Sequence, residues 1–310
     1  MKKLVSFLIM FLLIMTPFSV SANVNVIDTN DQNELYSMVK KDTIIETKIN
    51  EYDEFKKLQN TDENTLLSQG WTEQEIKDLK EFDFEKALKE RANLSNENLS
   101  KMGYSSSKIS SLKENISNAA LSEADLRAYS GVLTLKMGFM STTNSARDWK
   151  IYYEWFWDPQ PIFLTKDIIG IKALGSVNGT VAVPTLMSDS IANTNYEFYD
   201  NSGSNSVKGS FTRVDLNLAQ YVFNMQSTGS NGLKTWARSG YGHVHFNNTT
   251  PMDRLTVGVQ YGHSQGSLSP SIEISGGSGG ISGGVTFAFS YGVNNEASLV
   301  KVFSPNGTEL

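Results

Sequence analysis

The spacing of apolar residues changes near residue 130 and predicts two structural regions. From about Asp31 to Tyr129 the chain is rich in Lys, Glu, Leu and Asn and has no proline, and its clearest apolar pairs are three positions apart, as in amphipathic helices. From Gly131 onward, apolar and polar residues alternate, which is the period of a β-strand. We therefore predict an α+β protein with a helical domain over residues 23–130 and an all-β domain over residues 131–310.

The helical region contains an internal repeat. The stretch LLSQGWTEQEIKDLKE (66–81) aligns with LSKMGYSSSKISSLKE (99–114) at a spacing of 33 residues. In each copy a glycine, Gly70 or Gly103, can take the positive φ that ends a helix, and an aromatic residue follows to pack over the turn. The Thr or Ser after the aromatic can cap the next helix. The repeat predicts two helix-turn-helix corners, which are too few copies for a solenoid.

The β region consists of many short runs with period-two alternation. The clearest runs are residues 255–261 and 285–293, in which Leu, Val, Phe and Tyr alternate with smaller or polar residues. Further runs lie near residues 133–139, 151–157, 168–174, 180–186, 196–199 and 214–223. Turn-rich segments such as DNSGSNS separate several of them, and a Gly/Ser-rich loop is expected near 275–284. This arrangement is typical of an antiparallel sandwich or a barrel-like domain.

Composition indicates an exported protein. Lys2 and Lys3 precede an apolar run from Leu4 to Met15 and a small-residue site ending at Ala22, which predicts a signal peptide over residues 1–22. No later apolar run approaches the ~20 residues of a membrane-spanning helix. The chain has no cysteine, so disulfides and a thiol nucleophile are excluded. We expect a secreted protein that is free outside the cell or associated with the cell surface.

The charge balance argues against nucleic acid as a partner. The formal net charge is −6 and no cluster of Lys and Arg stands out, whereas phosphate binding needs such a cluster.

The sequence Gly262-His263-Ser264-Gln265-Gly266 matches the G-x-S-x-G pattern of serine hydrolases. That pattern requires a helix directly after the serine, and the Pro- and Gly-rich residues that follow do not favour one. It also requires a histidine later in the chain than the serine, and all three histidines precede Ser264. We therefore interpret GHSQG as the end of a strand, and we expect no catalytic residue.

The three histidines define an alternative, metal-dependent function. His243 and His245 are two residues apart, so on a strand they share a face, and His263 follows in a similar Tyr-Gly-His phrase. Three imidazoles and a water can hold a catalytic Zn²⁺, so a metal-dependent hydrolase is the second hypothesis. The polar neighbours of His243 and His245 instead suit the solvated face of a half-buried sheet, which requires no cofactor. The sequence does not decide whether the three side chains converge.

The stretch DWKIYYEWFWDPQPIF (148–163) is the most aromatic in the chain. One strand face carries Trp149, Ile151, Tyr153, Trp155 and Trp157 and is a plausible core face. Tyr152 and Phe156 lie on the polar face, where aromatic rings could stack on sugars or on a partner. We therefore select Tyr152, Trp155 and Phe156 as candidate ligand-binding residues, with a cell-wall or surface glycan as the candidate partner.

Residues Ser267 to Val293 suggest a third hypothesis. Their last nine residues alternate in the manner of a membrane-spanning β-strand, so a membrane-active hairpin toxin is an alternative function. The glycine-rich residues before them are long for a tight hairpin, and a sandwich strand with a mobile loop explains the same pattern.

The Gly-aromatic-Ser/Thr corners and the YGHS…SLSPSIEIS segment resemble uncharacterised secreted proteins of Gram-positive bacteria. The resemblance implies export and no particular activity. Our principal hypothesis is an exported, non-enzymatic binding protein that acts at the cell envelope or outside the cell. The oligomeric state and the role of the helical domain are not predicted.

Overall fold

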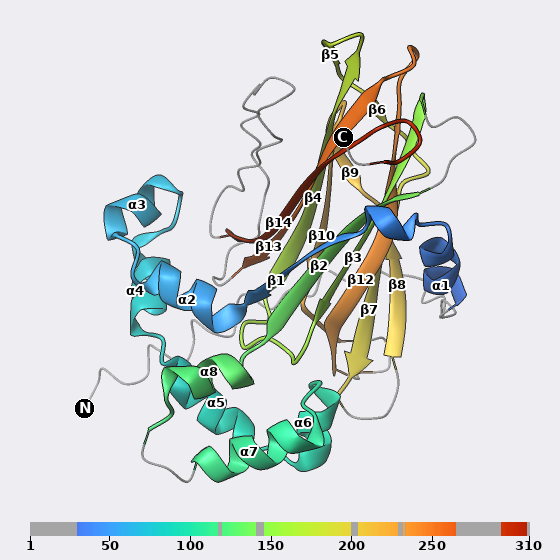
Figure 1. Cartoon of the computed structure of the whole chain (residues 1–310). Helices are drawn as coiled ribbons and strands as arrows, with labels where there is room; N and C mark the ends of the chain where they lie inside the picture. Colours follow the sequence, from blue (N-terminus) through green and yellow to red (C-terminus); the bar gives the residue numbers. More distant parts are fainter. Residues whose placement is uncertain are drawn as a thin grey trace.

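The computed structural model describes residues 30–116, 120–140, 146–199, 204–228, 232, 234–264 and 293–308. A helical region comes first and a mostly β region follows (Figure 1). The expected signal peptide, the Gly/Ser-rich loop and nearly all of Ser267 to Val293 lie outside the described residues. None of the described helices is both long enough and apolar enough to cross a membrane.

The helices are short, and most of them begin at a residue whose side chain accepts hydrogen bonds from the first turn. They are α1 (Asn30–Ser37), the 3₁₀ turn η2 (Lys41–Thr43), α2 (Glu51–Gln59), α3 (Glu63–Ser68), α4 (Glu73–Glu81), α5 (Phe84–Ala92), α6 (Asn96–Lys101), α7 (Ser106–Ile116) and α8 (Glu123–Tyr129). Thr72 forms a complete capping box with Glu75 at the start of α4. Such a cap satisfies backbone N–H groups that the first helical turn would otherwise leave unpaired.

Both predicted helix-turn-helix corners are confirmed. Gly70 and Gly103 have φ angles of 89° and 88°, which a residue with a side chain rarely adopts. The aromatic residues after them, Trp71 and Tyr104, are 4% and 3% exposed and belong to the core of the helical region.

The strands form two antiparallel sheets. They are β1 (Ile45–Asn50), β2 (Val132–Met140), β3 (Asp148–Trp157), β4 (Lys166–Val177), β5 (Thr180–Ala182), β6 (Thr185–Leu186), β7 (Ile191–Phe198), β8 (Ser204–Gly209), β9 (Thr212–Asp215), β10 (Leu218–Asn224), β11 (Gln226–Thr228), β12 (Lys234–Asn247), β13 (Arg254–Ser264) and β14 (Val293–Phe303). Sheet A has the order β1-β2-β3-β12-β7-β8, with β6 and β11 paired to β12. Sheet B has the order β14-β13-β4-β10-β9, with β5 paired to β4.

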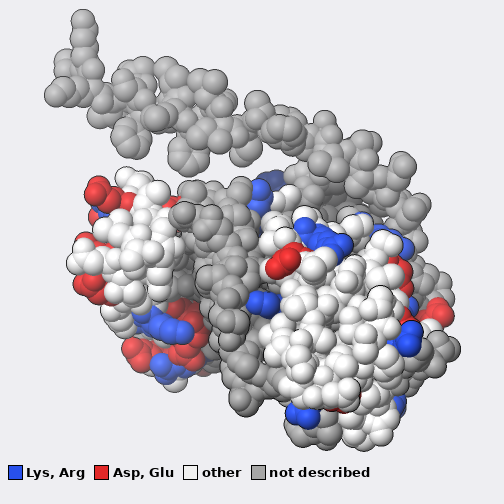
Figure 2. All heavy atoms as spheres, turned by 90° about the horizontal axis from the view of Figure 1, so that it is seen from above, with Lys and Arg blue, Asp and Glu red and all other residues white. Residues whose placement is uncertain are grey.

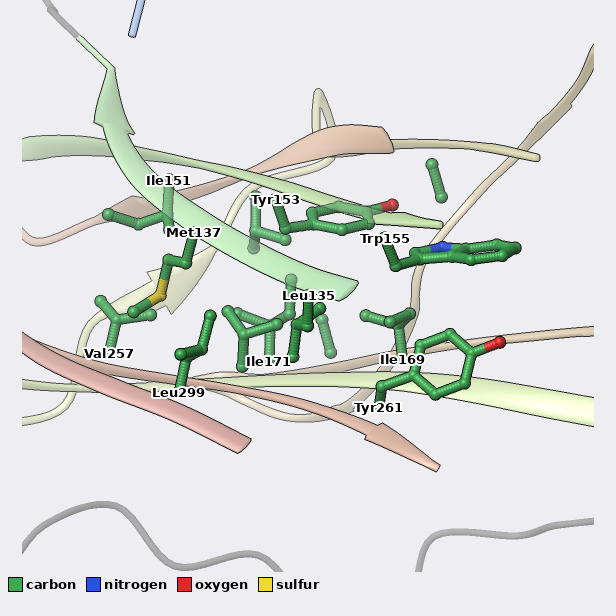
Figure 3. Close-up of a cluster of buried hydrophobic side chains, with 14 of the residues drawn as sticks. Leu135, Met137, Ile151, Tyr153, Trp155, Ile169, Ile171, Val257, Tyr261 and Leu299 are labelled. Atoms are coloured by element: carbon green, nitrogen blue, oxygen red, sulfur yellow. The ribbon is translucent and has the colours of Figure 1, made fainter. Parts of the chain in front are cut away.

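The two sheets pack face to face around one apolar core. Figure 3 shows Leu135 and Trp155 of sheet A facing Ile171 and Tyr261 of sheet B. The predicted core face of β3 is confirmed, because its five alternating members from Trp149 to Trp157 are all 0% exposed. Burying a large apolar side chain stabilises a fold by roughly 1.5–3 kcal/mol, so this face is a main contribution to the sandwich.

The region predicted to be helical also supplies a strand to the sandwich. β1 pairs with β2 from Ile45 opposite Met137 to Asn50 opposite Val132. Ile45 and Ile49 pack against the sandwich core, which explains why this six-residue segment joins the sheet. The change in composition near residue 130 is therefore not a clean boundary between helix and sheet.

The connection between β3 and β4 packs against the helical region and forms hydrogen bonds with it. Phe163 lies among the helical aromatics, 4.8 Å from Phe82 and 5.9 Å from Phe55 between ring centroids. Arg91 of α5 donates hydrogen bonds to the carbonyls of Gln160 and Pro161 at 2.6 and 2.8 Å. The two regions therefore share contacts that each needs for its own packing.

Candidate functional site

The three histidines do not meet. His243 and His245 lie on β12 in sheet A, whereas His263 lies on β13 in sheet B. Val244, between the two histidines, and Phe246, after the second, point into the core. His243 and His245 therefore project from the opposite face of sheet A. His263 is on the apolar side of β13, 5.1 Å from the Trp157 ring. A zinc site built from these three residues is not formed, because the sandwich core separates the pair from His263.

On β12, His245 rather than His243 belongs to a charged network. His245 lies between two carboxylates, with its Nδ1 2.7 Å from Asp189 and its Nε2 3.3 Å from Asp148. Lys150 donates to the other oxygen of Asp189 at 3.0 Å. His243 is 8% exposed, and this burial lowers its pKa to about 4. Within the described ranges, no group of three or more His, Asp or Glu side chains is arranged to hold a metal ion.

His263 belongs to a buried polar cluster at the junction of the two regions. Its Nδ1 is 2.7 Å from Asp167, its Nε2 is 3.9 Å from Glu51, and all three residues are 0% exposed. Asp167 also accepts a hydrogen bond from the hydroxyl of Tyr261, which accepts one from Trp157 Nε1 at 3.0 Å. A cluster closed to solvent in this way holds structure together and gives a substrate no access.

The glutamate of this cluster fixes the connection between the sheets. Glu51 accepts hydrogen bonds from the backbone N–H groups of Ile162 and Phe163 at 2.6 and 3.0 Å. Its other oxygen accepts from Gly131 at 3.4 Å. One carboxylate at the start of α2 therefore holds the chain both just before β2 and in the connection that follows β3.

Ser264 of the GHSQG motif is the last residue of β13 and pairs with Val293 of β14. Its side chain, Gln265 and Gly266 lie outside the described residues. Because His263 is held by Asp167, the histidine next to Ser264 is already engaged in the interior.

The aromatic candidates on β3 lie in packed surroundings. Tyr152 is 1% exposed, because α1 covers it with Tyr36 at 5.8 Å between ring centroids. Trp155 is 0% exposed and stacks on Phe223 at 4.8 Å. Phe156 is half-buried, with Lys136 Nζ 5.3 Å from the centre of its ring. Tyr152 and Trp155 thus face no solvent from which a glycan could reach them, and α1 is the reason that the polar face of β3 is closed at Tyr152.

Exposed apolar side chains gather at one end of the sandwich, on the β5–β6 segment (residues 180–187) and the β9–β10 hairpin (Figure 1). We call this set the apolar tip, and it consists of Val181 (49% exposed), Val183 (47%), Met187 (36%), Val214 (41%) and Leu216 (50%). The two segments are joined by a backbone hydrogen bond of 2.7 Å from Leu186 to the carbonyl of Leu216. Figure 2 looks down on this end of the sandwich and shows a rounded, mostly uncharged surface.

Local sequence explains how the apolar tip is presented. The β4–β5 hairpin turns at Asn178 and Gly179, whose φ angles are 52° and 77°, as an Asn-Gly hairpin turn requires. Ala182 packs toward the core, so its neighbours Val181 and Val183 point to the other side. Sequence reasoning missed these residues. The available signal was two valines, one on each side of a core-facing alanine and directly after a hairpin turn.

Comparisons with known proteins give no family for the chain. No family model matches it, and no curated protein matches it. Among solved structures, it shows a weak likeness to AvmM, which catalyses macrocyclization in alchivemycin A biosynthesis, with a TM-score of 0.20, 12% identity, and coverage of 53% of this chain and 86% of that one. A second is the Clostridium perfringens NetB toxin in its membrane-inserted form, with a TM-score of 0.17, 8% identity, and coverage of 56% and 84%. Likenesses at these TM-scores carry no functional argument.

Proposed function

We propose that this protein is exported and acts by binding, without catalysis, at the cell envelope or elsewhere outside the cell. The apolar tip is the observation that carries the proposal. Five large apolar side chains on two joined segments remain 36–50% exposed, although the described part of the sandwich buries most of its other large apolar residues. Exposed apolar patches on a folded protein mark contact surfaces.

The polar groups that sequence analysis selected support the same proposal. His245 and His263 are each held by carboxylates, and the cluster around His263 is sealed from solvent. These groups stabilise the two sheets and their junction. We therefore assign the binding role to the apolar tip rather than to the buried Tyr152 and Trp155 of β3.

Co-sedimentation with purified Gram-positive cell walls tests the binding role. The chain over residues 23–310 should pellet with the walls, and Leu216→Asp should reduce the bound fraction. Val300→Asp is the matched control, because Val300 is 42% exposed on β14, away from the tip. Point variants are preferable to deleting residues 23–130, since that deletion removes β1 and the Glu51 contacts. If the chain bound neither to the walls nor to the vesicles of the experiment below, the binding role would be contradicted.

A second candidate function is a membrane-active hairpin formed by Ser267 to Val293. The pairing of Ser264 with Val293 supports it, because β13 ends and β14 begins at neighbouring positions of sheet B. Micromolar protein should then release dye from loaded liposomes, and Phe287→Asp should abolish release while leaving wall binding unchanged. Liposomes that stay intact with the unmodified chain would rule this candidate out.

A further inference from the structure

The chemistry of the apolar tip restricts what it can contact. Its side chains are aliphatic, apart from the thioether of Met187, and none donates a hydrogen bond. Recognition of one particular sugar or peptide depends on well-placed polar groups, which these side chains lack, so any contact of the tip with the wall polymers tested above is nonspecific apolar contact. They gain free energy only by leaving water for an apolar surrounding.

The shape of the tip also matters. The five side chains lie on the β5–β6 segment and the β9–β10 hairpin at one end of the sandwich, whereas the open groove between α3 and α4 lies in the helical region. A protein partner would have to match a convex surface closely, because protein interfaces are packed as densely as protein interiors. A bilayer interface deforms around an inserted side chain and needs no preformed complement.

The charges near the tip decide between kinds of lipid. Arg254 lies 3.7 Å from Asp253, and the Arg213 guanidinium donates to the carbonyl of Asp215 at 3.4 Å. Lys150 is engaged with Asp189. Among the described residues, these basic side chains each lie beside a carboxylate or a carbonyl and form no cluster of the kind that attracts anionic lipids, and the chain as a whole carries −6. A zwitterionic headgroup, which carries both signs itself, is compatible with such a border.

We infer that the apolar tip inserts into the interfacial layer of a zwitterionic lipid bilayer. This inference rests on the proposed binding role and names its partner. Val181, Val183 and Leu216 enter the boundary between headgroups and acyl chains, and the sandwich stays outside the bilayer. Binding through a partly inserted apolar surface scales with buried apolar area, so it persists in salt.

Flotation with phosphatidylcholine vesicles tests the inference on the chain over residues 23–310. The unmodified chain should float with the vesicles equally at 0.1 and 1 M salt. Val183→Asp and Leu216→Asp should each lower the vesicle-bound fraction about tenfold, because each places a charge where an apolar side chain enters the interface. Val222→Asp and Val300→Asp change valines that are 37% and 42% exposed away from the tip, and they should stay within about twofold of the unmodified chain.

The outcomes separate this inference from the binding role. Wall binding that depends on Leu216 without any flotation would overturn the lipid inference and leave the binding role standing. Flotation that needs anionic lipid and disappears in 1 M salt would overturn it too, since electrostatic attraction would then be the cause. Equal losses in tip and control variants would do the same. Circular dichroism verifies that each variant is folded, and the milder Leu216→Ser should give a smaller loss in the same direction.

Discussion

The helical region contains the same unit twice, in two different surroundings. The first unit is α2–α4 and the second is α5–α7. Residues 33 positions apart have equivalent structural roles in the two units. Lys80 donates to the carbonyl of Thr61, and Lys113 donates to that of Leu94. The matched positions also include the N-caps Asn50 and Asp83, the N-caps Asp62 and Ser95, the buried Leu66 and Leu99, and the turn glycines Gly70 and Gly103.

The two corners differ in what they contact. In the second corner, the carbonyl of Lys101 accepts from Trp236 Nε1 at 3.2 Å and that of Met102 accepts from the Gln160 N–H at 2.8 Å. Figure 1 shows α6 beneath the strands and α3 well away from them. The first corner has an open groove of about 440 Å³ beside it, lined by Leu67, which is 42% exposed. Local sequence thus fixes the shape of a corner, and a few residues elsewhere decide whether it is docked.

Removing the residue that secures the second unit should have the largest effect. Arg91 is 9% exposed and bonds two carbonyls of the β3–β4 connection, whereas the matching residue of the first unit is Leu58. Arg91→Ala leaves both carbonyls buried without this donor, so it should lower the unfolding free energy by about 3 kcal/mol. Urea denaturation measures the loss. Arg127→Ala is the control, because Arg127 is half-exposed beside Asp53 and such pairs contribute less than about 1 kcal/mol. Equal losses would contradict the docking role.

Acid should destabilise the β region more than the helical units, because all three histidines lie in the β region. His243 has a pKa of about 4 in the folded protein, below the usual 6.5, so the unfolded chain binds its proton more readily. This contribution to stability is complete above pH 6.5 and is lost as the pH falls toward 4, up to about 3 kcal/mol. Denaturation of the unmodified chain and of His243→Gln at several pH values measures it. If the two curves stay parallel between pH 6.5 and 4, His243 is not the cause.

Alanine at the two turn glycines compares the corners directly. Each substitution forces a side chain into the left-handed region, at a loss of about 1–2 kcal/mol. At Gly103 the new Cβ would also lie 3.3 Å from Asp158 and 3.4 Å from Pro159. Gly103→Ala should therefore be worse than Gly70→Ala by about 1 kcal/mol in urea denaturation. Equal losses would mean that the second corner is loosely docked.

Replacing Leu67 of the first corner by the residue at the matching position of the second corner should have the smallest effect on stability. Leu67→Ser reproduces Ser100 at an exposed position, so stability should change by less than about 0.5 kcal/mol. Thermal unfolding followed by circular dichroism measures the change. A clear loss would show that Leu67 packs more closely than its exposure indicates, and Leu66→Ser, at a fully buried position, provides the scale for a severe loss.

Sequence reasoning succeeded where the cause is local. The turn glycines, the capping box at Thr72 and the alternation of β3 each depend on a few adjacent residues. It failed where the cause is distant. His263 is held by Asp167, which lies 96 residues earlier, and Tyr152 is covered by Tyr36 of a helix to which the sequence assigned no role. The apolar tip was missed because its members come from two segments that meet only in the folded sandwich.

The pairing of β1 with β2 has a consequence for how this architecture can vary. Asn50 lies opposite Val132, so both helical units together form the loop of one long hairpin. The entropy of closing a loop grows only with the logarithm of its length, so a third unit of 33 residues between α4 and α5 would raise that closure term by about 0.3 kcal/mol. Chain closure therefore hardly limits the number of units, and related proteins can differ by whole repeats on an unchanged sandwich.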